Sequence, residues 1–365
     1  MVRRLLPIAA VILLGLGAFL MLAPAPGSVR SRVVAADDTD VRTLGHVQYG
    51  TQTLQVEILD GAHTGKLFPV GNTLRGQMEL DNRFAPGDIA VVSEPTGQVA
   101  TLAAASHWRL GVMAAAFAAF AILLVVFGGG VGANALLSFV FCCLIIWKLV
   151  VPLALAGHNA SLVAFAATAA MTAVIMLSVG GFTRKALAAF AGSMLGASAG
   201  LGIARLLGAA LGVNGATLPF VQTLVYSGAA DLDLADIFIA ATILAGSGAM
   251  MDLAMDIAAG VREVARHSPG LGFWELFMSG IRIGRATVGT MTTTLLLAYS
   301  GGYLTLLMVF AAQGTPPSGF LNSPLVVAEA AKTLAGSFAI VLVAPFTALV
   351  AARLFAGGAK GGHES

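Results

Sequence analysis

Long runs without a charged residue follow one another along most of the chain beyond residue 107. A helix that spans a bilayer needs about 20 consecutive apolar residues, and these runs are long enough to supply several. They cover residues 110–147, 149–183, 186–204, 206–230 and 286–328. Glycine clusters, prolines and single charges divide this part of the chain into seven predicted helices, at residues 109–127, 132–152, 160–180, 186–210, 235–258, 286–312 and 325–353.

An eighth apolar run lies near the N-terminus, at residues 5–23, directly after Arg3 and Arg4. It is longer than the core of a signal peptide, which has about 7–15 apolar residues. The best cleavage frame, Ala23-Pro24-Ala25, is followed by Pro26, which is sterically poor after a scissile bond. We therefore favour an uncleaved membrane anchor at residues 1–23 over a signal peptide.

Residues 24–107 have a different pattern and hold half of the acidic residues. Leu54, Val56 and Ile58 alternate with polar residues, which is typical of a half-buried strand. Residues 41–49 suggest a second strand, and the turn at residues 86–88 leads into a third at 89–93. Three to five short strands predict a small β-barrel-like domain, similar to an OB fold. His46 and His63 lie in it without a second ligand at metal spacing, and we interpret them as surface histidines.

The composition identifies an integral membrane protein. Hydrophobic residues make up 58% of the chain, charged residues 10%, and the mean hydropathy is +0.89, whereas a soluble domain needs far more charge to cover its surface. The net charge of +2 does not indicate a nucleic-acid partner. Cys142 and Cys143 stand side by side in an apolar run and predict buried thiols, with no disulfide and no metal site.

The placement of lysine and arginine predicts the orientation, because cytoplasmic loops carry an excess of both. With a cytoplasmic N-terminus, the inner loops carry ten of the 20 lysines and arginines, whereas the short outer loops carry little beyond Lys148. This orientation makes residues 24–107 extracytoplasmic and the tail at 354–365 cytoplasmic. We expect a multi-pass plasma-membrane protein, mainly α-helical, with about eight transmembrane helices, the last seven within residues 108–353.

Small residues recur every fourth position in the predicted helix 186–210, with Gly192, Gly196 and Gly200 at its centre. Such a stripe lets a second helix approach closely, because packing must hold helices together in lipid. The stripe predicts a helix–helix seam. A seam that slides during transport is the alternative.

Two carboxylates, Asp252 and Asp256, interrupt the apolar helix 235–258 and share one face of it. Asp252 is interpreted either as a structural residue, capping or pairing with Arg285, or as an ion- or proton-binding residue. Asp256 lies near the cytoplasmic boundary and is interpreted as interfacial, although two nearby carboxylates can share a proton. We hypothesise an ion or substrate site built from Asp252, Asp256, Ser247, Thr290 and Thr294 in the cytoplasmic half, with ordinary interhelical hydrogen bonding as the alternative for the threonines.

Two further segments carry polar residues. Glu329 stands three residues before Lys332 near the outer face, where the two can pair with each other or contact an external ion or solute. Residues 261–285 have apolar residues at helical spacing beside charged ones, which predicts a cytoplasmic amphipathic helix along the inner leaflet. We interpret it as an interfacial linker, with a lateral gate as the alternative.

Several motifs resemble the YibE/F family of bacterial multi-pass membrane proteins, over about Val41 to Val350. The most specific is Gly246-Ser247-Gly248-Ala249-Met250-Met251-Asp252, and others are Gly180-Gly181-Phe182-Thr183, Gly289-Thr290-Met291-Thr292 and Val343-Ala344-Pro345. The resemblance implies a permease-like protein without a known substrate. The chain departs from the family at Ala286, where an acidic residue is usual, and at Asp256, where serine is common. The turn at residues 128–132 also lacks the basic residue expected there.

The sequence contains no catalytic motif of the serine-hydrolase, phosphate-loop or zinc-peptidase type. We expect no enzyme and no cofactor. The first hypothesis is a transporter of an unidentified ion or small solute, with the lipid bilayer and that solute as its partners. The alternative is a non-transporting receptor or accessory protein whose β-domain binds a protein partner.

Overall fold

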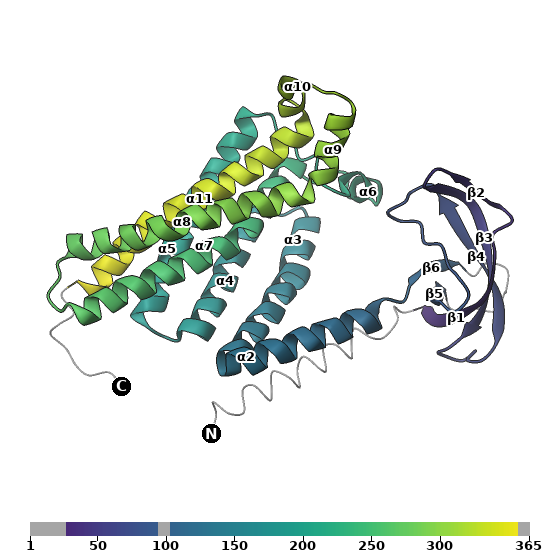
Figure 1. Cartoon of the computed structure of the whole chain (residues 1–365), viewed down its shortest axis with the longest axis horizontal. Helices are drawn as coiled ribbons and strands as arrows, with labels where there is room; N and C mark the ends of the chain where they lie inside the picture. Colours follow the sequence, from purple (N-terminus) through teal and green to yellow (C-terminus); the bar gives the residue numbers. More distant parts are fainter. Residues whose placement is uncertain (1–26, 94–102, 357–365) are drawn as a thin grey trace. The chain divides into compact units, whose positions relative to one another are not determined.

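The computed structural model describes residues 27–93 and 103–356, which fall into two compact units, one ending at Ala133 and the other starting at Asn134 (Figure 1). The predicted anchor at residues 1–23 and most of the predicted tail lie outside the described residues.

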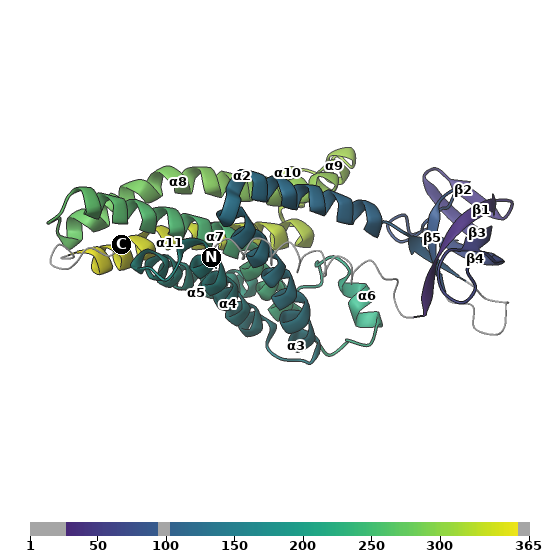
Figure 2. The same ribbon diagram turned by 90° about the horizontal axis from the view of Figure 1, so that it is seen from below.

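The first unit contains an antiparallel sheet shaped as a half-barrel, which Figure 2 shows from a second direction. Neighbouring strands follow the order β2-β3-β1-β5-β6, while β4 pairs with β3, and a single parallel bridge joins Gly71 to Ala103. The strands are β1 (Ser28–Asp37), β2 (Val41–Leu44), β3 (Val47–Ile58), β4 (Leu67–Arg75), β5 (Ile89–Ser93) and β6 (Ala104–His107).

Two differences from the predicted strands have local causes. Residues 41–49 form a hairpin instead of one strand, because Gly45 has a positive φ of 62° and Leu44 pairs with Val47. Strands β1 and β4 were not predicted, because each places a polar side chain among its inward positions. Ser31 and Asn72 are buried there, and the apolar alternation is broken at both.

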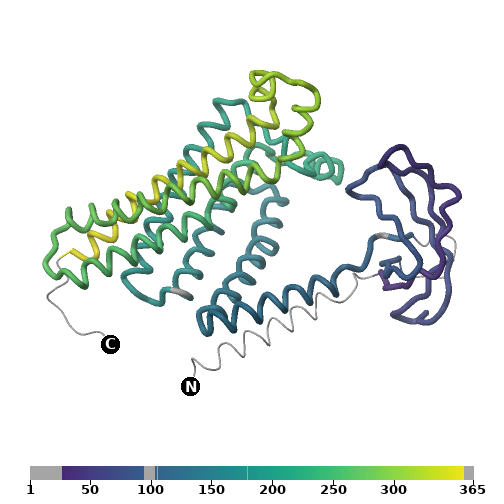
Figure 3. The backbone as a smooth tube through the Cα atoms, in the orientation of Figure 1, coloured from purple at the N-terminus to yellow at the C-terminus, as the bar shows by residue number. Residues whose placement is uncertain are grey.

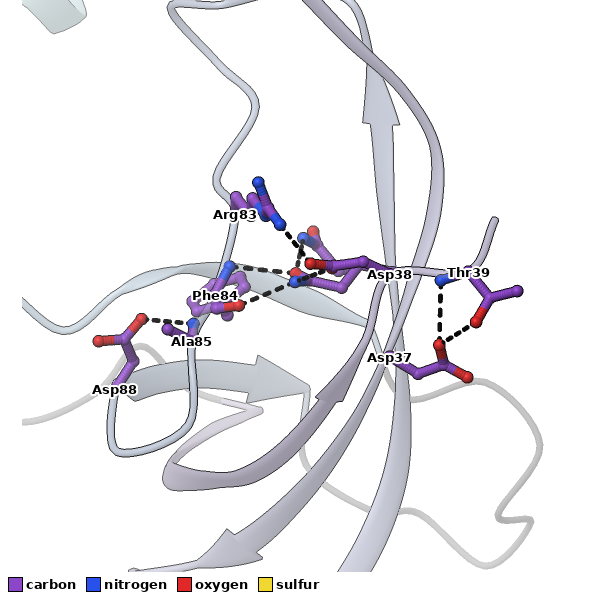
Figure 4. Close-up of polar contacts among 9 residues, drawn as sticks. Asp37, Asp38, Thr39, Arg83, Phe84, Ala85 and Asp88 are labelled. Atoms are coloured by element: carbon purple, nitrogen blue, oxygen red, sulfur yellow. Dashed lines mark hydrogen bonds and ion pairs between the residues drawn. The ribbon is translucent and has the colours of Figure 1, made fainter. Parts of the chain in front are cut away.

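Gln52 is a buried polar side chain that fastens a loop to this sheet. Its amide nitrogen donates to Asp38 and to the Phe84 carbonyl, and its amide oxygen accepts from Asn72 and from the Phe84 nitrogen. Arg83 pairs with Asp38 beside it (Figure 4). Every hydrogen-bonding position of the Gln52 amide is therefore used, as burial requires.

His46 is exposed, and His63 packs edge-on against Phe68.

The remaining described residues are helical. Five helices are long and apolar enough to cross a membrane, or six if the bent pair α8–α9 counts as one span. The helices are α2 (Leu110–Ile145), followed by a π-helical turn (Ile146–Val150), α3 (Val151–Leu155), α4 (Ala160–Gly180), α5 (Arg184–Ala210), α6 (Val221–Tyr226), α7 (Leu234–His267), α8 (Phe273–Gly302), α9 (Leu304–Ala312), α10 (Pro317–Leu321) and α11 (Pro324–Phe355).

Polar residues define where three of these helices begin. Asn159, Thr183 and Asp233 each accept a hydrogen bond from a backbone N–H of the first turn, at the starts of α4, α5 and α7. Within α2, Gly129 breaks the helix with a φ of 53° and a ψ of −129°. A side chain at Gly132 would overlap the Leu124 carbonyl, so the chain bends tightly there.

Helix α7 lies at the centre of the second unit and packs against α4, α5, α8 and α11 (Figures 1 and 2). The stripe of small residues on α5 lies against α11. A Cβ atom at Gly192 would overlap Thr347, one at Gly196 would overlap Val343, and one at Gly200 would lie 2.8 Å from the Ala339 Cβ atom. The two backbones approach this closely because α5 has no side chains there.

Residues 261–285 form the end of α7 and the start of α8, and Gly280 and Gly284 pack against Ala348 and Ala344 of α11. The cytoplasmic, interfacial position of this segment stays a prediction. Helical spacing of apolar residues cannot tell a lipid surface from a neighbouring helix.

The expectation of buried thiols at Cys142 and Cys143 is wrong, since the first is half-buried and the second is exposed. An apolar run does not reveal which of its sides meets protein.

The seam can be tested with two alanine substitutions on the same helix. We expect Gly196→Ala to destabilise the protein by about 1–3 kcal/mol, because the new methyl group overlaps Val343. Gly202→Ala is the matched control, since no atom lies within 4 Å of its new methyl group, and alanine favours a helix by up to about 1 kcal/mol. Thermal unfolding in one detergent measures both. Equal shifts would contradict the seam.

The β-unit should lose stability in acid through Asp60. Arg30 donates two hydrogen bonds to Asp60, of 2.6 and 2.7 Å, and these lower the pKa of Asp60 below its ordinary value of 3.8. A carboxyl whose pKa is lower in the folded state stabilises the fold above pH 3.8 and loses this contribution as the pH falls through the folded value.

Hydrogen exchange of β1 and β3, compared at equal pH, measures this effect. We expect Asp60→Asn to lower protection at neutral pH and to match the wild type near pH 2. Glu79→Gln, at an exposed residue, is the control. A constant difference between Asp60→Asn and the wild type at all pH values would exclude the proposed cause.

Candidate functional site

The predicted carboxylates of α7 point away from the helix core. Asp252 and Asp256 are exposed, together with Ala245 and Gly248 on the same face. Their neighbours Leu253, Ala254 and Ile257, on the other side of the helix, are completely buried. Among the described residues, no hydrogen bond or ion pair reaches either carboxylate, so Asp252 does not pair with Arg285 in this structure.

The other residues of the predicted cytoplasmic site make local hydrogen bonds. Ser247 is buried and donates to the Leu244 carbonyl. Thr290 and Thr294 are exposed on α8, and their hydroxyls donate to the Thr287 and Thr290 carbonyls. Their oxygens keep acceptor capacity, but the structure gives no hydrogen bond from them to Asp252. An oxygen site formed by Asp252 and these threonines stays a prediction.

A small apolar cavity lies at the crossing of α5, α7 and α11. Its volume is about 10 Å³, and it is lined by small and apolar residues, among them Gly200, Gly246, Met250 and Gly336. About 10–15 Å³ is needed for a single water molecule, and a water also needs polar partners. This cavity is a packing defect between small residues and offers no place for a polar solute.

Glu329 is in a different situation, because it is part of a buried charged cluster. Its Oε1 atom accepts hydrogen bonds from Lys332, at 2.8 Å, and from the Tyr303 hydroxyl, at 2.6 Å. The side chains of Glu329 and Lys332 are only 15% and 12% exposed. The Lys332 Nζ atom also lies 5.9 Å from the ring centres of both Phe238 and Tyr299. We call these five residues the Glu329 cluster.

The cluster brings together three helices and a bend. Glu329 and Lys332 are in the second and third turns of α11, Phe238 is near the start of α7, and Tyr299 is in the last turn of α8. Tyr303 is the residue at which α8 ends and α9 begins, with a bend of 61° between them (Figure 3). The hydrogen bond from Tyr303 to Glu329 therefore ties the bend to α11.

Two polar atoms of the cluster are buried without a partner. They are the second carboxylate oxygen of Glu329, Oε2, and the Tyr299 hydroxyl. Other hydroxyls of the described membrane helices are unpartnered as well, at Thr168, Ser193 and Thr347, but each of these is a neutral group. An unpaired oxygen on a buried charge is more costly. A bound ligand is one way to satisfy it.

Stability alone does not account for this pair. A buried ion pair loses about as much hydration free energy as it gains in attraction, and apolar replacements of similar volume are often neutral or stabilising. Ionisable residues inside membrane helices commonly mark substrate paths. The Glu329 cluster is therefore the strongest candidate site in the described residues.

The sequence pattern pointed to Glu329 but not to its aromatic partners. Tyr299 and Tyr303 are four residues apart and are two of only four tyrosines in the chain. This spacing was visible in the sequence. Their proximity to Glu329 was not, because it depends on how α8 packs against α11.

A second polar network joins α4, α5 and α7. Arg205 donates to the Ser161 hydroxyl at 2.8 Å, and the Ser161 N–H donates to the buried carboxylate of Asp236 at 2.9 Å. A carboxylate at the start of a helix is stabilised by its free N–H groups and its dipole. Asp236 thus closes the N-terminus of α4, and sequence analysis did not predict this role.

The coupling inside the Glu329 cluster can be measured with a double-mutant cycle. We expect Lys332→Met to destabilise the protein by about 3–5 kcal/mol, because it leaves a buried carboxylate without its counter-charge. Adding Glu329→Gln removes that charge and should recover part of the loss. Thermal unfolding of the two single variants and the double variant gives the coupling energy. Additive losses would show that the two charges do not interact.

The comparisons with known proteins identify a family but no closer relative. Searches of curated proteins and of solved structures each gave no match. Residues 116–357 match the family described as YibE/F-like protein. The match covers more than half of the chain and includes α4, α5, α7, α8 and α11 with the Glu329 cluster. The chain therefore belongs to the YibE/F-like family of multi-span membrane proteins.

Proposed function

We propose that this protein is a transporter, or permease, that moves an ion or a small solute across the plasma membrane. The observation that carries the proposal is the Glu329–Lys332 pair, which is buried among apolar helices. One oxygen of its carboxylate has no hydrogen-bond partner. A site with unpaired polar atoms inside a membrane unit is what a passing ion or solute needs.

The bend beside this pair supports the proposal. Many transporters bind their substrate where a membrane helix is broken, because the free backbone groups at the break face the site. Here α8 is broken at Tyr303, and the Tyr303 side chain contacts the Glu329 carboxylate. A change in what Glu329 binds would act directly on this bend.

We propose Asp252 as a second polar position for the moving solute, in the cytoplasmic half. Phe238 and Asp252 are both on α7, about 21 Å apart at 1.5 Å per residue. An exposed carboxylate on an apolar helix costs about 2.5–3.5 kcal/mol at the bilayer centre. In the proposal, Asp252 avoids this cost by facing water or another polar segment, with Asp256, Ser247, Thr290 and Thr294 near it.

The proposal includes eight transmembrane spans. The 46 residues from Leu110 to Leu155 would be about 69 Å long as one straight helix, roughly twice the hydrocarbon thickness of about 30 Å. The break at Gly129 divides them into two spans. Together with α4, α5, α7, the pair α8–α9, α11 and an anchor at residues 1–23, this makes eight. Both termini are then cytoplasmic and residues 24–107 extracytoplasmic.

Transient currents from proteoliposomes on a solid-supported membrane test transport even while the substrate is unidentified. Concentration jumps of Na⁺, K⁺, ammonium, Mg²⁺, chloride and phosphate form the panel. We expect at least one to give a current that Glu329→Gln and Asp252→Asn each lower at least tenfold, as the loss of a charged ligand should (about 1.4 kcal/mol per tenfold). Glu263→Gln is the matched control, since Glu263 is exposed and pairs with Arg266.

The receptor alternative makes the opposite prediction in cells. If residues 24–107 bind a protein partner and the helices only anchor them, deletion of residues 41–99 should abolish the cellular function. Glu329→Gln and Asp252→Asn should then be tolerated. That combination, with no current from any member of the panel, would exclude transport.

A further inference from the structure

We propose that the Glu329 cluster binds a small primary ammonium cation, and that Lys332 occupies the site as an internal ammonium when no ligand is bound. This inference rests on the proposed function and names the chemical class of its substrate. It starts from the geometry around the Lys332 Nζ atom.

The Lys332 ammonium already shows how such a cation would be held. It contacts the Glu329 carboxylate at 2.8 Å and lies within 6 Å of two aromatic ring centres, those of Phe238 and Tyr299. A carboxylate combined with aromatic faces is the arrangement that proteins use to bind organic ammonium groups. A lysine side chain ends in the same chemical group as methylammonium.

The unpartnered atoms of the cluster extend this arrangement. Glu329 Oε2 can only accept hydrogen bonds when the carboxylate is charged, and the Tyr299 oxygen can accept as well. Both therefore suit a ligand rich in N–H donors. A primary ammonium group has three such donors, which is enough for both oxygens.

Other ligand classes fit the cluster less well. Anions are repelled by Glu329, and the Arg205 guanidinium, on α5, already donates to the Ser161 hydroxyl. The Asp236 carboxylate accepts from the Ser161 N–H. Divalent cations prefer six or more oxygen ligands, whereas the cluster offers one carboxylate and two tyrosine hydroxyls beside a lysine. Alkali cations gain less from aromatic faces when only a few oxygens are present.

Charge balance makes the binding an exchange. Glu329 compensates one positive charge, and Lys332 supplies it in this structure. A second cation would leave the buried cluster with a net positive charge, so the arriving ammonium displaces the Lys332 ammonium. The flexible four-carbon stem of lysine allows this movement. No covalent bond is made or broken, and Tyr303 keeps its acceptor on Glu329 Oε1.

Methylammonium chloride is the probe for the full-length protein in proteoliposomes, with NaCl and KCl jumps at equal ionic strength as comparisons. At pH 6, where methylammonium is fully charged, we expect a saturable current in the wild type that exceeds those of Na⁺ and K⁺. Glu329→Gln should lower it at least tenfold. Phe238→Leu should raise the half-saturating concentration about threefold or more. Glu263→Gln should change neither.

A thermal shift in detergent tests binding separately from transport. We expect methylammonium, but not NaCl, to raise the Tm of Lys332→Ala, in which the site is vacated. Lys332→Met fills the space with an apolar chain and should show no such shift. The double variant Glu329→Gln/Lys332→Ala should also show none. The comparison stays informative if each variant is less stable than the wild type.

The outcomes separate this inference from the proposed function. A Glu329-dependent current with Na⁺ or K⁺ but not with methylammonium overturns the ammonium site and leaves transport standing. A methylammonium shift in Tm that requires Glu329, without any current, supports the site and overturns transport. If methylammonium gives no current and also no shift in Tm, the inference is wrong.

Discussion

The close approach of α5 and α11 is the contact on which the arrangement of the membrane unit depends. At Gly192, Gly196 and Gly200 the α5 backbone leaves room for Thr347, Val343 and Ala339 of α11. In lipid, helices gain little by hiding apolar surface, so such contacts must come from closely fitting shapes. Because α11 is held in this way, its second and third turns are placed beside α7 and α8, where Glu329 and Lys332 meet their aromatic partners.

A second constraint is that polar groups in a membrane must find partners inside the protein. Most of the described polar side chains of the helices satisfy it locally. Thr172, Ser198 and Thr242 donate to a carbonyl one turn earlier, and Asp236 accepts from the start of α4. The exceptions are informative against this background. Only in the Glu329 cluster, among the described residues, does an unpartnered oxygen belong to a buried charge, beside an unpartnered tyrosine hydroxyl.

The two acidic candidate sites of the membrane unit, one on α7 and one on α11, differ in the surfaces that they face. Asp252 and Asp256 lie on the outer side of α7, away from the buried residues Leu253 and Ile257. Glu329 lies between helices with its counter-charge beside it. A carboxylate without a partner can accept hydrogen bonds from water or from another polar segment. A buried carboxylate with a counter-charge can exchange that cation for another. In the proposed transport, the first kind of position serves entry or exit and the second serves selection.

The sequence by itself determined the class of protein, the course of most helices and the family. Long uncharged runs can only be buried in lipid or protein, and the residues that cap α4, α5 and α7 act on their own helix. The period-2 alternation at Leu54, Val56 and Ile58 likewise identified β3. Strands β1 and β4 escaped prediction because Ser31 and Asn72 are buried polar residues, whose burial depends on the far side of the sheet.

Only the tertiary structure decided which polar residues are brought together. A helical pattern tells which side chains share a face, but not whether that face meets lipid, water or another helix. For this reason the sequence pointed to Asp252, which is exposed in the structure. It did not point to Tyr299, Tyr303 and Phe238, because their contacts in the cluster depend on how α7 and α8 pack against α11. The Glu329 cluster joins residues that are up to 94 positions apart, and only the packing of the helices makes them neighbours.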